Sequence, residues 1–279
     1  MVIFKNSLYN KDATRFNLKI KYILKSILFC LLFTGLFVFF SFVKPFIPAK
    51  FERLGYGIIG ISAALLITFL FLKIDKKTFA DIGLKLENAT LKKFFTGIVV
   101  GAGIMGFMTI GVIYFSGFKM EANKNSSILN FLFCALPLIP LAFMEEVAFR
   151  AYPLILLKDK VGLRMSILIT SILFALYHIA NGWTIENSFL GAGVWGIVYS
   201  SAAIYSNGIS MPTGLHYAAN LTTSLFGATG NSFNIWILKQ KNGLTLEHYQ
   251  SSQLTILIPQ ITLLIFAVIC MEWLVKNKD

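Results

Sequence analysis

Charged residues are scarce in this chain of 279 residues. Only 14% of them are Asp, Glu, Lys or Arg, whereas soluble domains usually carry about 25%. Hydrophobic residues make up 56% of the chain and stand in long blocks, which excludes an ordinary soluble fold. A helix that crosses a bilayer needs about 20 predominantly apolar residues. The composition therefore predicts an all-α, polytopic membrane protein with about eight transmembrane helices.

Cysteine is also rare, and its three positions exclude two kinds of site. Cys30, Cys134 and Cys270 lie far apart, each within an apolar block. Such spacing supports neither a disulfide framework nor a thiolate metal site. Isolated buried cysteines usually pack as small hydrophobic residues, so we expect that role here.

Acidic residues are outnumbered, and the formal net charge is +12. The lysines and arginines flank the apolar blocks, mainly within 5–25 and 73–93. Basic residues beside membrane spans orient them towards the cytoplasm and attract anionic lipids. We therefore expect membrane lipids and no nucleic acid as partners. We also expect residues 1–25 to form a basic cytoplasmic segment, residues 26–279 to form one membrane domain, and both termini to be cytoplasmic.

Eight spans can be placed along the chain. Prolines at 137 and 140 should divide the fourth block, and a turn at 207–208, with Pro212 after it, should divide the charge-free stretch that begins at Asn187. A short interfacial segment is expected at 78–84 and a polar loop at 229–253, where His248 should be solvated. The expected spans are 26–43, 54–72, about 94–118, about 128–157, a span from Arg164 to near Ala180, two helices within 187–228, and about 254–274.

Glycines within the second and third spans predict close helix packing. Residues 55–60 read Gly-Tyr-Gly-Ile-Ile-Gly, which matches a dinucleotide-binding fingerprint literally. That fingerprint requires a preceding strand and a βαβ unit, so we interpret these glycines as helix contacts. Gly97 and Gly101 have the small-residue spacing that brings helices together in lipid.

Few ionisable side chains fall inside the predicted spans, and each one is a candidate functional residue. Glu146 and Arg150 are four residues apart, so they share a helix face and can form an ion pair. Glu145 points about 100° away around the helix and lacks that partner. A carboxylate in such a place suits a general base.

Two histidines and an amide complete the set on other spans. His178 lies near the end of the fifth span, whereas His216 and Asn220 share one face of the seventh. Amide hydrolysis would suit these residues, with Glu145 and His178 activating water and His216 and Asn220 donating to the oxyanion. Alternatively, Glu145, His178 and His216 would be the ligands of a zinc ion or another divalent metal; the sequence leaves both possibilities open.

Three motifs in this order resemble a known family. Glu145-Glu146-Val147-Ala148-Phe149-Arg150 resembles the Glu-Glu-x-x-x-Arg motif of the CPBP intramembrane proteases, also called the CAAX prenyl protease 2 or Abi family. Residues 174–178 resemble the Phe-x-x-x-His motif of the family, and residues 216–220 its His-x-x-x-Asn motif. Residues 80–84 and 189–196 are also similar to the family pattern. The motif core is 141–220, within a protease domain over 26–279.

The resemblance implies an intramembrane endopeptidase of eight helices that cleaves a peptide or protein substrate. It implies catalytic roles for Glu145, His178, His216 and Asn220, with Glu146 and Arg150 in support and no required cofactor. Family members have been described both as glutamic proteases and as metalloproteases, so the metal question remains. The resemblance also suggests peptide maturation or bacteriocin immunity. A non-catalytic peptide-binding immunity protein and a proton-coupled transporter are the alternatives.

Overall fold

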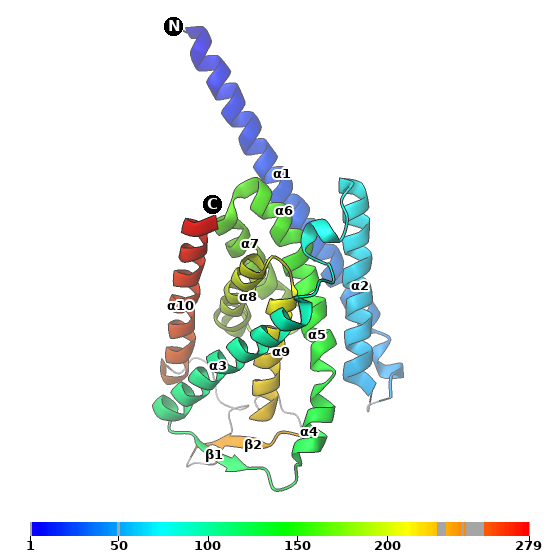
Figure 1. Cartoon of the computed structure of the whole chain (residues 1–279), viewed down its shortest axis with the longest axis vertical. Helices are drawn as coiled ribbons and strands as arrows, with labels where there is room; N and C mark the ends of the chain where they lie inside the picture. The colour runs from blue at the N-terminus through cyan, green and yellow to red at the C-terminus, as the bar shows by residue number, and fades with distance from the viewer. Residues whose placement is uncertain (1, 49–50, 228–232, 241–242, 244–253, 279) are drawn as a thin grey trace.

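The computed structural model describes residues 2–48, 51–227, 233–240, 243 and 254–278. Helices form almost all of this part of the chain (Figure 1). The helices α1 and α2 lie along one side of the bundle and α10 along the other, while α3 crosses obliquely in front of α9. The ends of the chain lie at the same end of the molecule. The predicted all-α membrane fold is confirmed.

The bounds of the elements follow the predicted spans to within a few residues, except at the N-terminus, where a single helix runs from Val2 through the basic segment. In chain order the elements are α1 (Val2–Ser41), η1 (Lys44–Phe46), α2 (Glu52–Asp75), η3 (Ala80–Ile82), α3 (Thr90–Ser116), β1 (Lys119–Ala122), α4 (Ile128–Ala135), α5 (Leu138–Glu146), η4 (Val147–Ala151), α6 (Tyr152–Val161), α7 (Leu163–Ala180), η5 (Asn187–Gly193), α8 (Val194–Ser206), α9 (Ser210–Leu225), β2 (Trp236–Lys239) and α10 (Leu254–Lys278).

Seven helices among the described residues are long and apolar enough to cross a membrane. The chain is therefore a multi-pass membrane protein. The one predicted span that is not among these seven is the seventh in chain order, α9, which has only 16 residues. It packs against α3, α5 and α8, and most of its middle residues are buried. Because protein rather than lipid surrounds it, α9 needs neither the length nor the apolar surface of an outer span.

Glycines set the two closest helix crossings near the bundle centre. A Cβ atom added at Gly101 would lie 2.7 Å from the carbonyl oxygen of Leu215, so α3 and α9 touch through their backbones. In the same way, a Cβ atom at Gly60 would collide with the sulfur of Met144, which lies one residue before Glu145. The glycines of the second and third spans are thus helix contacts, as predicted, and they position α5 and α9.

The segment between α2 and α3 packs on the turn between α8 and α9. Asp81 of η3 accepts hydrogen bonds from the backbone N–H and the hydroxyl of Thr78, at 2.7 and 2.8 Å. These bonds, the backbone one foremost, lower the pKa of the Asp81 carboxyl. Gly83, with φ of 77°, approaches so closely that an added Cβ would lie 2.9 Å from the Cα of Gly208. Asn207 ends α8 with φ of 52°, which confirms the turn predicted at 207–208.

A two-stranded antiparallel ribbon corrects the prediction of a plain polar loop at 229–253. Strand β2 pairs with β1, with Lys119 opposite Lys239 and Ala122 opposite Trp236. Its partner strand lies more than a hundred residues upstream, so no local pattern announces the pairing. Within this loop, His248 falls outside the described residues.

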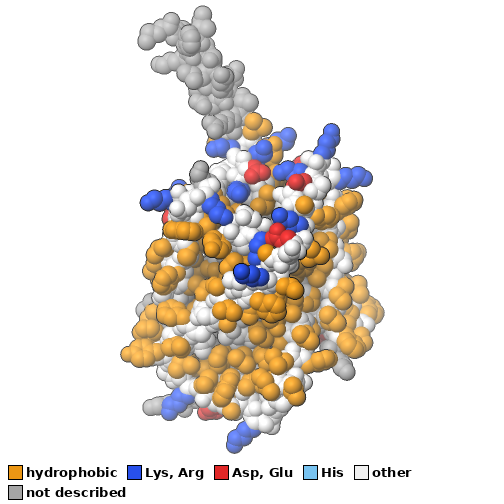
Figure 2. Space-filling view, in the orientation of Figure 1, with side chains coloured by type: hydrophobic (Ala, Val, Ile, Leu, Met, Phe, Trp, Pro, Cys, Tyr) orange, Lys and Arg blue, Asp and Glu red, His pale blue; other side chains and the backbone are white. Residues whose placement is uncertain are grey.

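The surface divides by polarity (Figure 2). Hydrophobic side chains cover the middle of the visible face, and most of its lysines and arginines lie towards the end from which α1 projects.

Prolines divide the fourth block as predicted, because α4 ends at Ala135 and Pro137 is the N-cap of α5. That division leaves Glu145 and Glu146 in the last turn of α5, at the centre of the bundle.

Candidate active site

A π-helical turn follows the two glutamates. Helix α5 ends at Glu146, and the widened turn η4 carries Arg150 before α6 begins. Such turns are rare and frequently occur at functional sites. All five residues of η4 are buried, so Arg150 is held within the bundle rather than directed to lipid.

Glu146 is fully buried and contacts two cationic or ionisable side chains. Its Oε1 atom lies 2.8 Å from Nδ1 of His216 and 3.5 Å from Nη1 of Arg150. The ion pair expected from the four-residue spacing is therefore present. The sequence did not predict the shorter contact with His216, which crosses from α5 to α9.

Glu145 points away from Arg150, as its position around the helix predicted. The hydroxyl of Tyr177 donates a hydrogen bond to its Oε1 atom at 3.4 Å. Its other oxygen, Oε2, lies 3.6 Å from Nε2 of His216. The Glu145 side chain is 14% exposed, whereas that of Glu146 is 0% exposed. Glu145 is therefore the glutamate that water can reach.

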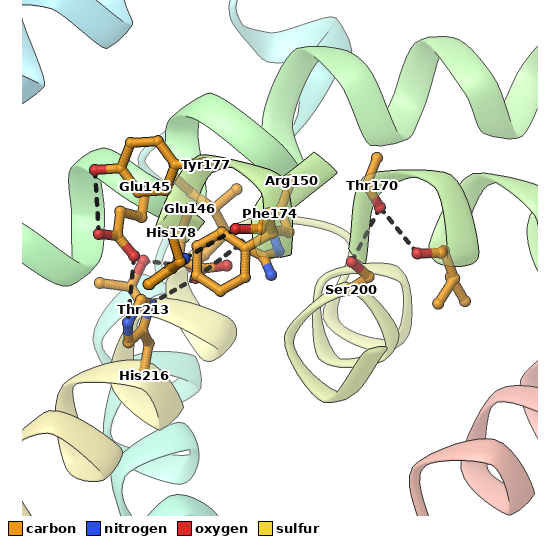
Figure 3. Close-up of polar contacts among 12 residues, drawn as sticks. Glu145, Glu146, Arg150, Thr170, Phe174, Tyr177, His178, Ser200, Thr213 and His216 are labelled. Atoms are coloured by element: carbon orange, nitrogen blue, oxygen red, sulfur yellow. Dashed lines mark hydrogen bonds and ion pairs between the residues drawn. The ribbon is translucent and has the colours of Figure 1, made fainter. Parts of the chain in front are cut away.

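His178 lies in the last turn of α7, beside the other site residues (Figure 3). Its Nδ1 atom is 2.9 Å from the carbonyl oxygen of Phe174. The ring of Phe174 lies 4.5 Å from the ring of His178 and 6.1 Å from that of His216. His178 is also close enough to Glu145 and His216 for electrostatic interaction. Three separate helices thus bring one carboxylate and two imidazoles together.

The hydrogen bonds fix which nitrogen of each ring carries a proton. A carbonyl oxygen can only accept, so Nδ1 of His178 donates to Phe174. Glu146 likewise accepts from Nδ1 of His216. When neutral, each imidazole therefore presents a lone pair at Nε2. An Nε2 donor on His216 requires the doubly protonated ring, and the Glu146 carboxylate is placed to stabilise its charge.

Asn220 lies one turn after His216 on α9, at partial exposure. Within the described chain its side chain makes no hydrogen bond, so the structure leaves its amide free and does not join it to Glu145. Its role stays a prediction.

Two tyrosines of the site, Tyr177 and Tyr199, were not predicted from the sequence. Tyr199 of α8 stacks on His216, with ring centroids 4.5 Å apart and planes 16° apart, and its ring also lies 5.2 Å from the Arg150 guanidinium. Tyr177 contacts Glu145. Tyr177 stands next to His178 in the second motif, which is a usable signal. No local pattern marks Tyr199.

The same residues are also the candidate metal ligands. Two imidazoles with protonated Nδ1 atoms and one carboxylate are a donor set that zinc accepts. However, no three His, Cys, Asp or Glu side chains among the described residues lie close enough to hold one ion. The chemistry of the donors fits a metal and their positions do not, so we derive no step through one.

The family comparison covers this site. The family model described as "Type II CAAX prenyl endopeptidase Rce1-like" matches residues 126–222. This match covers 97 of the 279 residues, and that segment is similar to the Rce1-like family. No curated protein matches the chain. The matched segment runs from just before α4 almost to the end of α9.

The Rce1-like segment contains every candidate site residue from Glu145 to Asn220. Rce1-like proteins are type II CAAX prenyl endopeptidases, which hydrolyse peptide bonds. The segment that holds the site is thus similar to a family of peptidases, and a peptide or protein is the class of substrate that this family implies.

Proposed function

We propose that this Rce1-like protein is an intramembrane endopeptidase that hydrolyses a peptide bond at or within the membrane. In this proposal Glu145 and His178 activate a water molecule, and His216 and Asn220 stabilise the oxyanion. The observation that carries it is the position of the His216 ring between the two glutamates, with Nε2 3.6 Å from Glu145 and Nδ1 2.8 Å from Glu146.

The difference in exposure supports Glu145 as the base. A general base must reach the proton that it removes, and Glu145 is the more exposed glutamate. His178 donates through Nδ1 to a backbone carbonyl, so the lone pair of its Nε2 atom can accept a hydrogen bond from the same water. Two acceptors would then orient the water oxygen towards the substrate carbonyl carbon.

The contacts of His216 support its role as an oxyanion donor. Glu146 faces Nδ1 and stabilises the protonated ring, so that Nε2–H becomes available for donation. Preorganised donors in a site with little water often provide the largest part of catalysis, and the loss of one costs roughly 100- to 1,000-fold in rate. Asn220, one turn away on α9, has an unengaged amide for the same oxygen.

The proposed reaction conserves atoms and charge. The water oxygen bonds to the carbonyl carbon while Glu145 takes one of its protons, which leaves the negative charge on the former carbonyl oxygen. The C–N bond then breaks as the proton passes from Glu145 to the departing amine. The direct products are a carboxylic acid and an amine, and Glu145 returns to its ionised form. The acid keeps the second proton of the water until it passes that proton to the released amine, which gives a carboxylate and an ammonium group.

Mass spectrometry of candidate membrane peptides, co-expressed with the wild type or with variants, tests the proposal. Glu145→Gln and His178→Ala should abolish the new peptide terminus, and His216→Ala should slow its appearance by roughly 100- to 1,000-fold. Glu121→Gln is the matched control, because this glutamate lies on β1 with 57% of its side chain exposed. Undiminished cleavage by both Glu145→Gln and His178→Ala would refute the assignment.

The same experiment separates the alternatives. A non-catalytic immunity protein would bind the peptide without producing a new terminus, and a proton-coupled transporter would move it intact.

Because the proposed steps use no metal, a chelator should leave cleavage unchanged. Loss of activity that added zinc restores would replace the water-activation step with a metal mechanism. Peptide maturation and bacteriocin immunity are the proposed biological roles, so precursor peptides and bacteriocins are the substrates to test first.

A further inference from the structure

An apolar groove lies away from the glutamates, between α3, α8, α9 and α10. Its volume is about 540 Å³, and nearly all of its lining atoms are apolar. The side chains that line it include Val100, Phe107, Val198, Leu263, Phe266 and Leu274. An apolar space of this volume suits a hydrocarbon chain.

A second, polar pocket joins one end of this groove. It measures about 430 Å³ and is lined by Lys92, Lys93, Thr96 and Asn207, among others. Tyr205 and Met211 line both cavities. The two cavities therefore adjoin at these residues, and together they place an apolar space beside a cationic one.

The charges at the polar end favour an anion. Lys93 forms an ion pair with Glu87, whereas exposed Lys92 makes no ion pair in the described part of the chain. Lys278 adds a second cation, because its ammonium group donates to the carbonyl oxygens of Ile204 and Tyr205 at 3.0 and 3.2 Å.

We propose that this composite site binds one anionic membrane lipid, with an acyl chain in the apolar groove and the phosphate beside Lys92. Basic pockets between transmembrane helices hold anionic head groups in this way. A free phosphate would leave the groove without an occupant, and a zwitterionic lipid would bring a positive group to Lys92. The charge complementarity therefore selects an anionic lipid.

Such a lipid would touch the face of α9 that carries Met211 and Leu215. These two residues also meet the glycines of α3 through their backbones. A bound acyl chain would thus contact α9 next to its crossing with α3. We expect the lipid to raise the thermal stability of the folded protein, independently of whether Glu145 acts as a base.

The first test uses the purified full-length chain and two lipids with identical acyl chains, phosphatidylglycerol and phosphatidylcholine. Native mass spectrometry should show one phosphatidylglycerol retained and little phosphatidylcholine, with a higher unfolding temperature for the anionic lipid. Lys92→Gln should weaken retention about fivefold, the effect typical of one basic residue near a lipid surface. Lys119→Gln, an exposed lysine on β1, should have no effect.

A matched pair of glycines on α3 tests the groove itself. Gly103 lines the groove and Gly106 does not, and an added Cβ would meet nothing within 4 Å at either position. Gly103→Phe should prevent lipid retention, and Gly106→Phe should preserve it. Equal retention of the two lipids, or no effect of Lys92→Gln, would overturn the proposal. If Gly103→Phe does not fold, the lysine variants decide alone.

Discussion

His216 is the side chain on which the candidate site converges. One ring nitrogen contacts Glu146 and the other faces Glu145, while Tyr199 stacks on the ring. Glu146 and Arg150 do not form a fully satisfied pair, because Oε2 of Glu146 and Nε and Nη2 of Arg150 have no hydrogen-bond partner among the described residues. A buried ion pair that is incompletely satisfied is a poor device for stability. We therefore infer that Glu146 acts mainly through its charge on His216.

Glu146→Gln tests this inference. Glutamine keeps the size of the side chain and an acceptor for Nδ1 of His216 but removes the negative charge. Cleavage, measured as the initial rate of product formation, should fall about 10- to 100-fold, because a hydrogen bond to a charged group is worth about 1.5–3 kcal/mol.

Tyr177→Phe provides the comparison, since it removes only the hydroxyl that donates to Glu145 at 3.4 Å. A single hydrogen bond of this kind is worth about 1 kcal/mol, so the loss should stay below tenfold. A Glu146→Gln enzyme with the rate of the wild type would show that its charge does not act on His216.

At the scale of helices, backbone contacts hold the site together. Gly97 and Gly101 of α3 lie against the backbone of α9 at Met211 and Leu215, and Gly214 of α9 lies against Phe94. Since Leu215 precedes His216, any separation of α3 and α9 would displace the imidazole from the glutamates.

Gly101→Leu should therefore lower the free energy of unfolding. Overpacking of a tight contact costs about 1–3 kcal/mol, and here the obstacle is backbone, which cannot rotate away. Gly106→Leu is the control on the same helix, because its added Cβ meets nothing within 4 Å. Thermal unfolding in detergent measures both variants; equal unfolding temperatures would contradict the role given to the crossing.

Hydrophobic blocks predicted the helices well, because a segment that lies in lipid must satisfy its backbone N–H and C=O groups with its own hydrogen bonds, as a helix does. Pro137 and Asn207 also marked breaks that the structure contains. The spacing of Glu146 and Arg150 predicted their pair. In contrast, the contact between Glu146 and His216 and the stacking of Tyr199 depend on how α5, α8 and α9 cross. Such crossings follow from tertiary packing, and no local pattern encodes them. For the same reason the β1–β2 ribbon was missed.

At the scale of the whole molecule, the distribution of charge predicts the orientation in the membrane. The visible face has most of its basic side chains at the end where both ends of the chain lie. By the positive-inside rule this end should face the cytoplasm. The ribbon of β1 and β2, at the opposite end in Figure 1, should then face outward.

Single-cysteine labelling tests this orientation after Cys30, Cys134 and Cys270 have been replaced. Lys119→Cys, on β1, should react with a membrane-impermeant maleimide in intact cells. Lys77→Cys, just after α2, should react only in inverted vesicles. Labelling of Lys77→Cys in intact cells would reverse the predicted topology.

The enclosed position of α9 also has a consequence for how the protein is made. A polar helix of 16 residues is too short to partition into a bilayer on its own apolarity. During synthesis it can enter the membrane domain only after earlier helices are in place to pack around it. Because α9 carries His216, the site is incomplete until then. The nascent chain should therefore be catalytically inactive when it leaves the insertion machinery. It should gain hydrolytic capacity only after α9, its penultimate helix, has docked against the rest of the bundle.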